Sequence, residues 1–294
     1  MKNNSLIKVG FLLSYDYDFL KTSIPLIYKE ADTIVLAKDE QCRTWSGNTF
    51  TIADEFFKWI KDIDSQKKIK IYEDNFYLPE LSLVENDTRE RNMLADHLGK
   101  DGGWHVQLDA DEYIVNFKQF VDLLKSKSSF LDNPEKTQID FSFNFHVLYK
   151  RVEGGFLYVD GRPEIYPVAT NYPNYIACRK TNAIAISTGF DIIHHTWARK
   201  PDEVRMKLNN WTHAKDFNTE SYFKLWDAID KDNYKFVADF HPMIKGFWPK
   251  LGFLAGDKLE DAIKAITNLP VQKDNALVHA IKSNYWLKKI LNKH

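Results

Sequence analysis

Apolar runs and amphipathic segments alternate along the first half of the chain. Residues 6–13, 31–39 and 104–108 have the length and apolar character of strands in a covered sheet, and residues 67–75 supply a further strand. Between them lie helical patterns around residues 19–28, 50–63 and 87–99. Alternation of strand and helix predicts an α/β fold, with a mostly parallel, doubly wound sheet flanked by helices.

The pattern changes after residue 137. Residues 138–150 alternate strictly, with Asp140, Ser142, Asn144 and His146 on the polar face, which predicts a half-exposed strand in a small antiparallel element. Residues rich in Gly, Pro and Asn at 154–175 predict a long loop.

The C-terminal third is expected to be mainly helical. A short strand is predicted at 183–187 and a helix beginning with Pro201 in its first turn. The expected organisation is therefore a sheet domain over residues 1–200 and a helical C-terminal extension over residues 201–294.

Composition narrows the class of protein. The chain has 294 residues, of which 44% are hydrophobic and 28% charged, with a net charge of −1. With acidic and basic residues so nearly balanced, the chain has no overall positive charge of the kind that attracts nucleic acid. Cys42 and Cys178 lie far apart, which argues against a disulfide framework or zinc site and favours a cytoplasmic location. No run of 18 apolar residues predicts a membrane span.

The predicted strand at 104–108 leads directly into three carboxylates, Asp109, Asp111 and Glu112. Like charges this close repel unless a positive group lies between them. In a strand Asp109 and Asp111 point to one side, an oxygen pair suited to Mn²⁺ or Mg²⁺. The alternative is a loop whose acids favour the dipole of the next helix, and for Glu112 that alternative is preferred.

Asp39, Asp74 and Asp109 each follow a predicted strand. Ligands of doubly wound sheets bind beyond the carboxyl ends of the strands, so the three carboxylates indicate a site there. Neither GxxxxGK[ST] nor GxGxxG occurs, so any nucleotide must be held without a glycine-rich phosphate loop.

The stretch RERNMLADHLGKDGGWHVQLDADEYI (89–114) resembles the Arg-Asn helix and LDADE region of family 2 glycosyltransferases, which have the GT-A fold. The resemblance covers roughly residues 6–125, with a weaker similarity at 192–211. It implies transfer of a sugar, usually with inversion, from a nucleoside-diphosphate donor, by default a UDP-sugar. A glycan or lipid-linked acceptor and a Mn²⁺ or Mg²⁺ cofactor are also implied.

The resemblance assigns donor contacts along the first half of the chain. Ser14 and Tyr15 match positions lining the nucleoside, and Asp39 matches the carboxylate that recognises base and ribose. Here Asp39 stands in LAKDEQ, which departs from the family pattern. The further matches are Asp74 as a second base contact, Arg91 near the donor, and Asp109 with Asp111 at the metal and diphosphate.

An inverting transferase also needs a general base for the acceptor hydroxyl. By distance from the LDADE motif the first candidate is Asp191, the second is Glu164 and the third is Asp160. Of the adjacent pair His194 and His195 only one can face the site, and His195 is preferred as a third metal ligand or phosphate contact.

Aromatic residues supply two further hypotheses. Trp197, Arg199 and Trp211 are candidates for an acceptor platform, although core packing is the better interpretation of Trp211. The basic C-terminal segment carries an apolar stripe of Trp286, Leu287, Ile290 and Leu291. It predicts either an ordinary helix packed on the core or a peripheral contact at the inner face of a membrane.

Two other functions remain open. A sugar nucleotidyltransferase also places carboxylates at sheet ends, but normally has a glycine-rich loop near its first strand. A non-catalytic nucleotide- or glycan-binding relative is the other alternative, because the Glu-Asp or His-Glu pair that often supplies the family's base does not occur at the family's usual distance past the LDADE motif.

Overall fold

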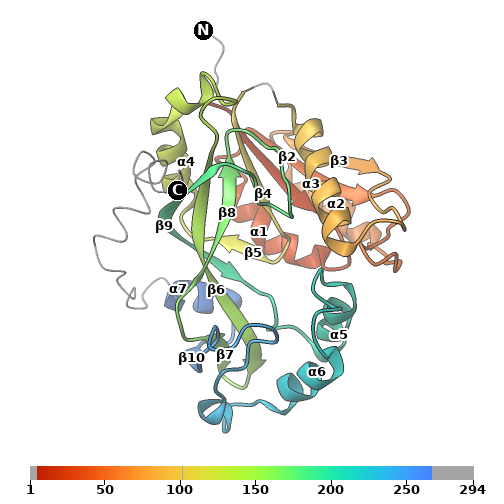
Figure 1. The fold of residues 1–294 in the computed structure, drawn as a ribbon, viewed down its shortest axis with the longest axis vertical. Helices are drawn as coiled ribbons and strands as arrows, with labels where there is room; N and C mark the ends of the chain where they lie inside the picture. The colour runs from red at the N-terminus through yellow and green to blue at the C-terminus, as the bar shows by residue number, and fades with distance from the viewer. Residues whose placement is uncertain (1–4, 101, 267–294) are drawn as a thin grey trace. The chain divides into compact units, whose positions relative to one another are not determined.

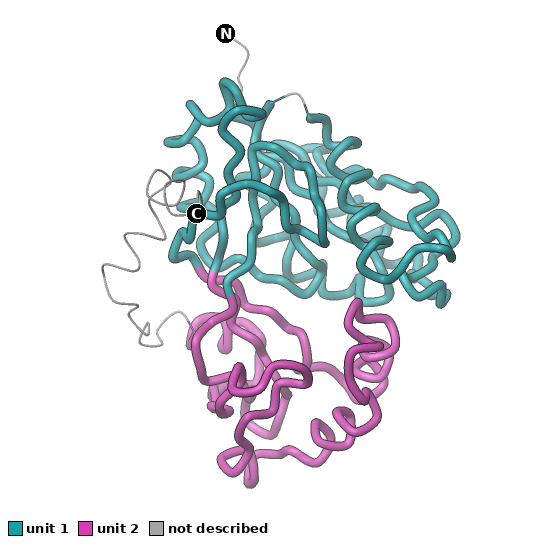
Figure 2. The backbone as a smooth tube through the Cα atoms, viewed as in Figure 1, with its two compact units in different colours: residues 1–143, 165–190, 273–294 teal, residues 144–164, 191–272 magenta. Residues whose placement is uncertain are grey.

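The computed structural model describes residues 5–100 and 102–266, which form two compact units (Figure 2). The first unit contains the chain up to residue 143 and residues 165–190, and the second contains residues 144–164 and 191–272 as far as they are described. The units are therefore interleaved along the chain. The predicted domains, 1–200 and 201–294, rest on sequence pattern alone and stay a prediction.

A mostly parallel sheet forms the centre of the first unit (Figure 1). Strands β1 (Ile7–Leu12), β2 (Thr33–Asp39), β3 (Ile69–Asp74) and β4 (Trp104–Leu108) pair in parallel in the order β3-β2-β1-β4. Strand β8 (Glu164–Thr170) joins β4 in antiparallel orientation. This confirms the predicted α/β fold, with a mostly parallel sheet and some antiparallel strands.

Helices flank this sheet: α1 (Leu20–Ile27), α2 (Asp54–Ile63), α3 (Leu83–Leu98) and α4 (Phe117–Ser126). Short 3-10 turns, η1 (Tyr17–Phe19) and η2 (Ser128–Leu131), precede α1 and follow α4. The start of α3 differs from the sequence prediction. Ser82 and Glu85 form its capping box, so Asp87, at which the predicted helical pattern began, lies inside the helix and is buried.

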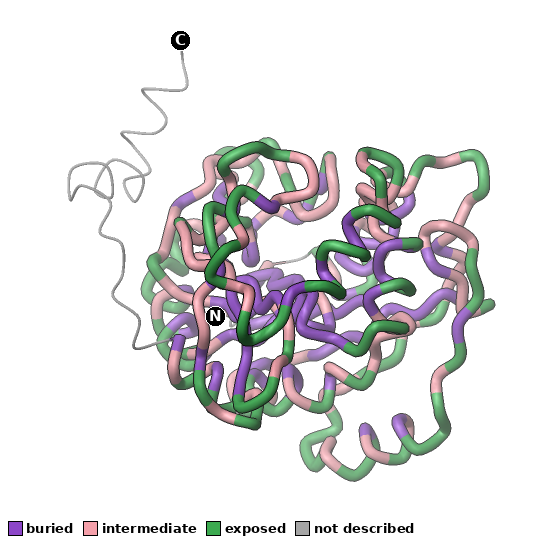
Figure 3. Tube along the Cα trace, turned by 90° about the horizontal axis from the view of Figure 1, so that it is seen from below, coloured by how far each residue is buried: buried purple, intermediate pink, exposed green. Residues whose placement is uncertain are grey.

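Glycine permits α3 to pack closely on β1. A Cβ atom at Gly10 would lie 2.7 Å from Leu94 Cδ2 and 3.2 Å from Leu98 Cδ1, closer than side chains tolerate. Leu94 and Leu98 join Leu12, Val35 and other apolar residues in one buried cluster. Buried positions gather in the interior of the trace and exposed ones on its outer loops (Figure 3).

Antiparallel strands and helices build the second unit. Strand β7 (Gly155–Val159) pairs with β6 (Ile139–Val152) on one side and β10 (Leu251–Ala255) on the other. The remaining elements are α5 (Pro201–Asn210), α6 (Thr219–Ala228), η3 (Tyr234–Phe236) and α7 (Leu259–Ile266). Strands β6 and β9 (Ile184–His194) begin in the first unit and end in the second, and β9 also pairs with β5 (Glu112–Ile114).

Two sequence predictions are wrong here. Residues 154–175, predicted as a loop, contain the whole of β7 and β8. In β7, Phe156 and Leu157 are apolar and are buried between neighbouring strands. Residues after 201 are not purely helical, since β10 completes the antiparallel sheet.

Candidate functional site

The sheet order creates a switch point in the first unit. Strand β1 lies between β2 and β4, so the chain crosses over in opposite directions from it. Ser14 and Tyr15, both half-buried, follow β1, and Asp109 follows β4. Ligands of such sheets bind beside this point, which places these three predicted residues in the expected region.

Arg91 of α3 contacts the carboxylate that directly follows β4. Its guanidinium donates from Nε to Asp87 Oδ1 at 2.5 Å and from Nη2 to Asp109 Oδ1 at 2.7 Å. Arg91 is 2% exposed, and its third nitrogen, Nη1, is buried without a hydrogen-bond partner in the described residues. Burial alone would raise the pKa of Asp109, but the charges of Arg91 and Arg179 lower it, so Asp109 stays ionised.

Arg179 pairs with the third carboxylate. Its Nη1 and Nη2 donate to Glu112 Oε2 and Oε1 at 2.6 and 2.7 Å, and Nη1 also donates to the backbone oxygen of Gln107. Glu112 is buried in strand β5 (Glu112–Ile114), so the helix-start loop preferred for it from the sequence is wrong. Two arginines therefore supply positive charge among the three carboxylates. Arg179 lies 67 residues from Glu112, and no sequence spacing indicated this pair.

A metal site needs carboxylates that an ion can reach. The Asp109 side chain is 34% exposed, whereas Asp111 is buried. Within residues 5–100 and 102–266, no group of three or more His, Cys, Asp or Glu side chains is arranged to hold a metal ion. Mg²⁺ commonly takes one or two protein carboxylates plus substrate phosphates. Asp109 and Asp111 supply carboxylates of the type and number that such an ion takes from a protein.

Asp39, the predicted contact to the nucleoside base, is enclosed by the loops that follow β2 and β3. Its Oδ1 accepts from the backbone N–H groups of Gln41 and Arg43 and from Arg43 Nε; its Oδ2 accepts from Arg43 Nη2, Phe76 N–H and Tyr77 N–H. Burial raises the pKa of Asp39, but these hydrogen bonds outweigh it and the net pKa is lowered. Both oxygens thus order the loop after β2.

Asp74 is the direct register partner of Asp39 on the edge strand β3. Its Oδ2 accepts from Tyr72 Oη at 2.6 Å and its Oδ1 from the N–H of Asn75 at 2.8 Å. The Tyr72 hydrogen bond lowers the pKa of Asp74. Asp74 is half-buried and is the last residue of β3, so it lies at the carboxyl end of that strand, as predicted.

Glu90 of α3 is a buried acid that the sequence reasoning did not single out. Trp45 Nε1 donates to its Oε2 at 2.7 Å. Burial raises the pKa of Glu90 to about 8, because the nearby Trp45 hydrogen bond only partly offsets desolvation. Glu90 is therefore mainly protonated at neutral pH.

Asp191, the first base candidate, belongs to the second unit. Its Oδ1 lies 2.8 Å from His146 Nε2 and 3.3 Å from Asn144 Nδ2. His146 was not among the candidates from the sequence, although the alternation of residues 138–150 had placed it with Asn144 on the polar face. The sequence could not indicate which strand this polar face would meet.

The other second-unit candidates each have a partner. Trp248 Nε1 donates to Glu164 Oε1 at 3.0 Å, and Asp160 pairs with Lys250 at 2.8 Å. His195 is buried, and its Nε2 donates to the carbonyl of Ala198 at 2.8 Å, so any metal contact would have to use Nδ1. The three predicted metal ligands are thus divided between the units, with His195 in the second.

The acceptor-platform hypothesis for Trp197 is wrong. Trp197 is fully buried in the aromatic core of the second unit, where Trp211 and Tyr222 contact its ring edge-on. A ring enclosed in this way offers no face to a sugar. Arg199 is buried as well, and Trp211 packs against the core, as preferred from the sequence.

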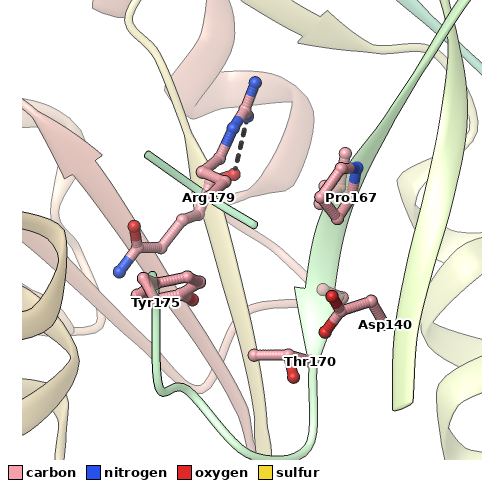
Figure 4. A pocket seen from close by; sticks show the side chains of 8 residues that line it. Asp140, Pro167, Thr170, Tyr175 and Arg179 are labelled. Carbon is pink, nitrogen blue, oxygen red and sulfur yellow. Dashed lines mark hydrogen bonds between the residues drawn. The ribbon is translucent and has the colours of Figure 1, made fainter. Parts of the chain in front are cut away.

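One small cavity adjoins β4 in the first unit. Asp140, Pro167, Thr170, Tyr175 and Arg179 surround it (Figure 4). Its volume of about 10 Å³ is at the lower limit for one water molecule. It is too small for a sugar or nucleotide and is not the substrate site.

The proposed membrane stripe, Trp286 to Leu291, lies outside the described residues. In the part of the chain that the structure describes, no helix has both the length and the apolar character needed to cross a bilayer.

Comparisons with known proteins do not identify the chain. No protein-family model matches it, and no curated protein matches it in sequence. The crystal structure of S. aureus TarS 1-349 superposes with a TM-score of 0.30 at 13% identity, covering 48% of this chain and 36% of that one. A mannose-1-phosphate geranyltransferase from Thermus thermophilus gives 0.27 at 8%, covering 77% and 65%. The chain thus spans less than two thirds of the length of each of these two proteins. Similarities this weak carry no argument about function, which must be argued from the residues of this chain.

Proposed function

We propose that the chain is a glycosyltransferase that moves a sugar from a nucleoside-diphosphate donor, by default a UDP-sugar, to a hydroxyl of a glycan or lipid-linked acceptor. The observation that carries this proposal is the position of Asp109 and Asp111 after β4, at the switch point, with Arg91 buried beside them. This is where doubly wound sheets bind nucleotides. The sequence resemblance at residues 89–114 supports the same assignment.

Donor binding is proposed for Ser14, Tyr15, Asp39, Asp74, Arg91 and Asp109. Since both oxygens of Asp39 accept hydrogen bonds from the loops after β2 and β3, we propose that it acts on the nucleoside through the loops that it orders. The buried guanidinium of Arg91 holds Asp109 in place and adds a fixed positive charge near the diphosphate.

Mn²⁺ or Mg²⁺ is the proposed cofactor, held by Asp109 and Asp111, with His195 as a further proposed ligand. A bound divalent ion would neutralise charge that grows on the departing diphosphate. The acceptor hydroxyl loses its proton to a base, for which Asp191 and Glu164 are the proposed residues, and its oxygen attacks the anomeric carbon opposite the diphosphate. We also propose a cytoplasmic location, with peripheral contact at the inner membrane face for a lipid-linked acceptor.

A thermal-shift panel tests the donor site. Wild type, Asp111→Asn and the control Asp122→Asn, an exposed aspartate on α4, are melted with nucleoside diphosphates and their sugars, with and without Mn²⁺. A ligand at one hundred times its dissociation constant stabilises by about 2.7 kcal/mol. We expect a shift with one nucleotide that requires Mn²⁺, persists in Asp122→Asn and is lost in Asp111→Asn.

Failure to shift with any nucleotide would refute the proposal. Product analysis then separates the remaining functions: free nucleoside diphosphate indicates sugar transfer, and pyrophosphate indicates a sugar nucleotidyltransferase. Nucleotide binding without turnover would favour the non-catalytic relative.

A further inference from the structure

Two buried oxygen atoms at the small cavity of the first unit have no hydrogen-bond partner among the residues that the structure describes. They are Gln107 Oε1, on β4, and Asp140 Oδ1, on β6. Both residues line the cavity, and they are only 1% and 3% exposed. A buried acceptor that no donor reaches costs free energy, so two of them at one cavity indicate a ligand that donates hydrogen bonds.

Helix α3 fixes the orientation of the Gln107 amide. Its Nε2 donates to the backbone carbonyl of Arg91 at 2.9 Å. A carbonyl can only accept, so the nitrogen of the amide must face Arg91 and the oxygen must be the other end. Arg179 donates to the backbone oxygen of Gln107 at 3.0 Å and leaves Oε1 without a donor. An amide oxygen has no proton of its own, so only a donor can satisfy Oε1.

The carboxylate of Asp140 is satisfied on one oxygen. Thr181 Oγ1 donates to its Oδ2 at 2.8 Å, whereas Oδ1 has no donor among the described residues. The hydroxyl of Thr170 has a single proton, and backbone carbonyls of Ile139 and Tyr172 lie within its reach. Burial raises the pKa of Asp140, and the two threonine hydroxyls only partly oppose this. A further donor at Oδ1 would therefore stabilise the ionised carboxylate.

The cavity has room for one small molecule and a lining of mixed charge. Its volume of about 10 Å³ is enough for a single water molecule and for nothing larger. Asp140 and Arg179, which carry opposite charges, both line it (Figure 4). An ion of either sign would therefore face a like charge. A water molecule is neutral, and its two O–H groups match the two acceptors.

We propose that one water molecule is bound in this cavity and donates its two protons to Gln107 Oε1 and Asp140 Oδ1. The water joins α3 to the loop of residues 171–183 through a continuous series of hydrogen bonds. The series runs from the carbonyl of Arg91 through Gln107, the water and Asp140 to Thr181. The site does not depend on the proposed transferase function, because it involves no donor or acceptor sugar.

The loop of residues 171–183 encloses the water. Asn92 of α3 holds it at both polar atoms: Asn92 Nδ2 donates to the carbonyl of Tyr175 at 2.9 Å, and the N–H of Tyr175 donates to Asn92 Oδ1 at 3.0 Å. Tyr175 and Arg179 both belong to this loop and both line the cavity. The water therefore leaves only when the loop opens, and it should exchange slowly with the solvent.

A crystal structure of the full chain tests the site directly, at a resolution at which ordered water is visible. We expect one water peak in the cavity, about 2.5–3.0 Å from both Gln107 Oε1 and Asp140 Oδ1. Thermal unfolding in sodium, potassium, ammonium and choline chloride at equal ionic strength separates water from a cation. We expect the same midpoint in all four salts.

Magnetic relaxation dispersion of the solvent then counts the slowly exchanging water molecules in wild type and variants. Asp140→Leu removes the acceptor with little change of side-chain shape and should lower the count by one. Asp140→Asn should keep the water, because its amide can still accept from Thr181 and donate to the water.

Asn86→Leu is the matched control. Asn86 is also a fully buried residue of the first unit, but its amide has protein partners at both ends: Oδ1 accepts from the N–H of Leu78, and Nδ2 donates to the carbonyl of Leu78. Asn86→Leu therefore loses buried hydrogen bonds, as Asp140→Leu does, and should keep the water count of wild type.

Three results would overturn the proposal. A direct contact between Gln107 Oε1 and Asp140 Oδ1 in the crystal would indicate a shared proton in place of the water. Stabilisation by one of the salts alone would indicate a bound cation. An unchanged water count in a folded Asp140→Leu would place the slow water elsewhere. If Asp140→Leu does not fold, the wild-type crystal decides, and the lack of a peak within hydrogen-bond distance of both oxygens refutes the site.

Discussion

Replacing Glu90 by Gln should remove a specific loss of stability at alkaline pH. Glu90 is buried on α3, and its pKa is raised from 4.5 to about 8, chiefly by desolvation. Gln has nearly the same shape and keeps a carbonyl oxygen for the Trp45 Nε1–H, but it cannot ionise. The substitution therefore tests ionisation with the packing and this hydrogen bond preserved.

The sign follows from proton binding. The folded chain holds the Glu90 proton more tightly than the unfolded chain, so this group favours the folded state most below the unfolded pKa. That stabilisation is lost as pH rises towards the folded pKa of about 8. With about 1.36 kcal/mol for each pKa unit, the wild type should lose about 2 kcal/mol through Glu90 between about pH 6 and about pH 8.

Urea unfolding of wild type and Glu90→Gln at both pH values measures this quantity. The difference between their free energies of unfolding should change by about 2 kcal/mol, in favour of Gln at the higher pH. Glu220→Gln, at an exposed site on α6, should run parallel to wild type. If wild type and Glu90→Gln also ran parallel, Glu90 would be ionised in the folded chain and the reasoning refuted.

The remaining predictions concern two further ionic contacts of the first unit, Arg179 with Glu112 and Asp39 with Arg43. Arg179→Ala should destabilise the chain by about 3–5 kcal/mol, because it leaves the buried Glu112 without its bidentate partner. The control is Arg205→Ala in the second unit, which breaks the exposed pair with Glu220 and should cost less than about 1 kcal/mol. Urea unfolding measures the free energy of unfolding of both variants. Equal losses in Arg179→Ala and Arg205→Ala would contradict the argument from burial. Asp39 has a lowered pKa, so its stabilisation is present above the unfolded pKa and is lost as pH falls through the folded pKa. Asp39→Asn should therefore unfold more readily than wild type at neutral pH but approach it in acid titrations, and an unchanged gap in acid would contradict this.

The sequence predicted features that depend on local pattern. The parallel strands β1, β2 and β4 appeared as apolar runs, and the position of Asp109 after β4 followed from the end of one such run. Pairings between distant segments could not be predicted. Neither the bidentate bond of Arg179 to Glu112 nor the single bond of His146 to Asp191 leaves a spacing signal, because they join residues 67 and 45 positions apart.

Composition also misled in one place. Residues 154–175 contain the Gly, Pro and Asn residues that usually mark loops, but two neighbouring strands provide hydrogen-bond partners for β7. Tertiary pairing therefore outweighed local preference. The ion pair of Asp39 with Arg43 could not be predicted from the sequence either. Arg43 stands in a loop, where spacing along the chain does not fix the direction of a side chain.

The absent side chain at Gly10 has a consequence for the charges beyond the sheet. Arg91 precedes Leu94 by three residues on α3, about 4.5 Å along the helix axis, and Leu94 rests directly over Gly10. An alanine at residue 10 would place its methyl carbon 2.7 Å from Leu94 Cδ2, so the Leu94 side chain or α3 itself would have to move. That adjustment would fall three residues along α3 from the guanidinium that holds Asp109.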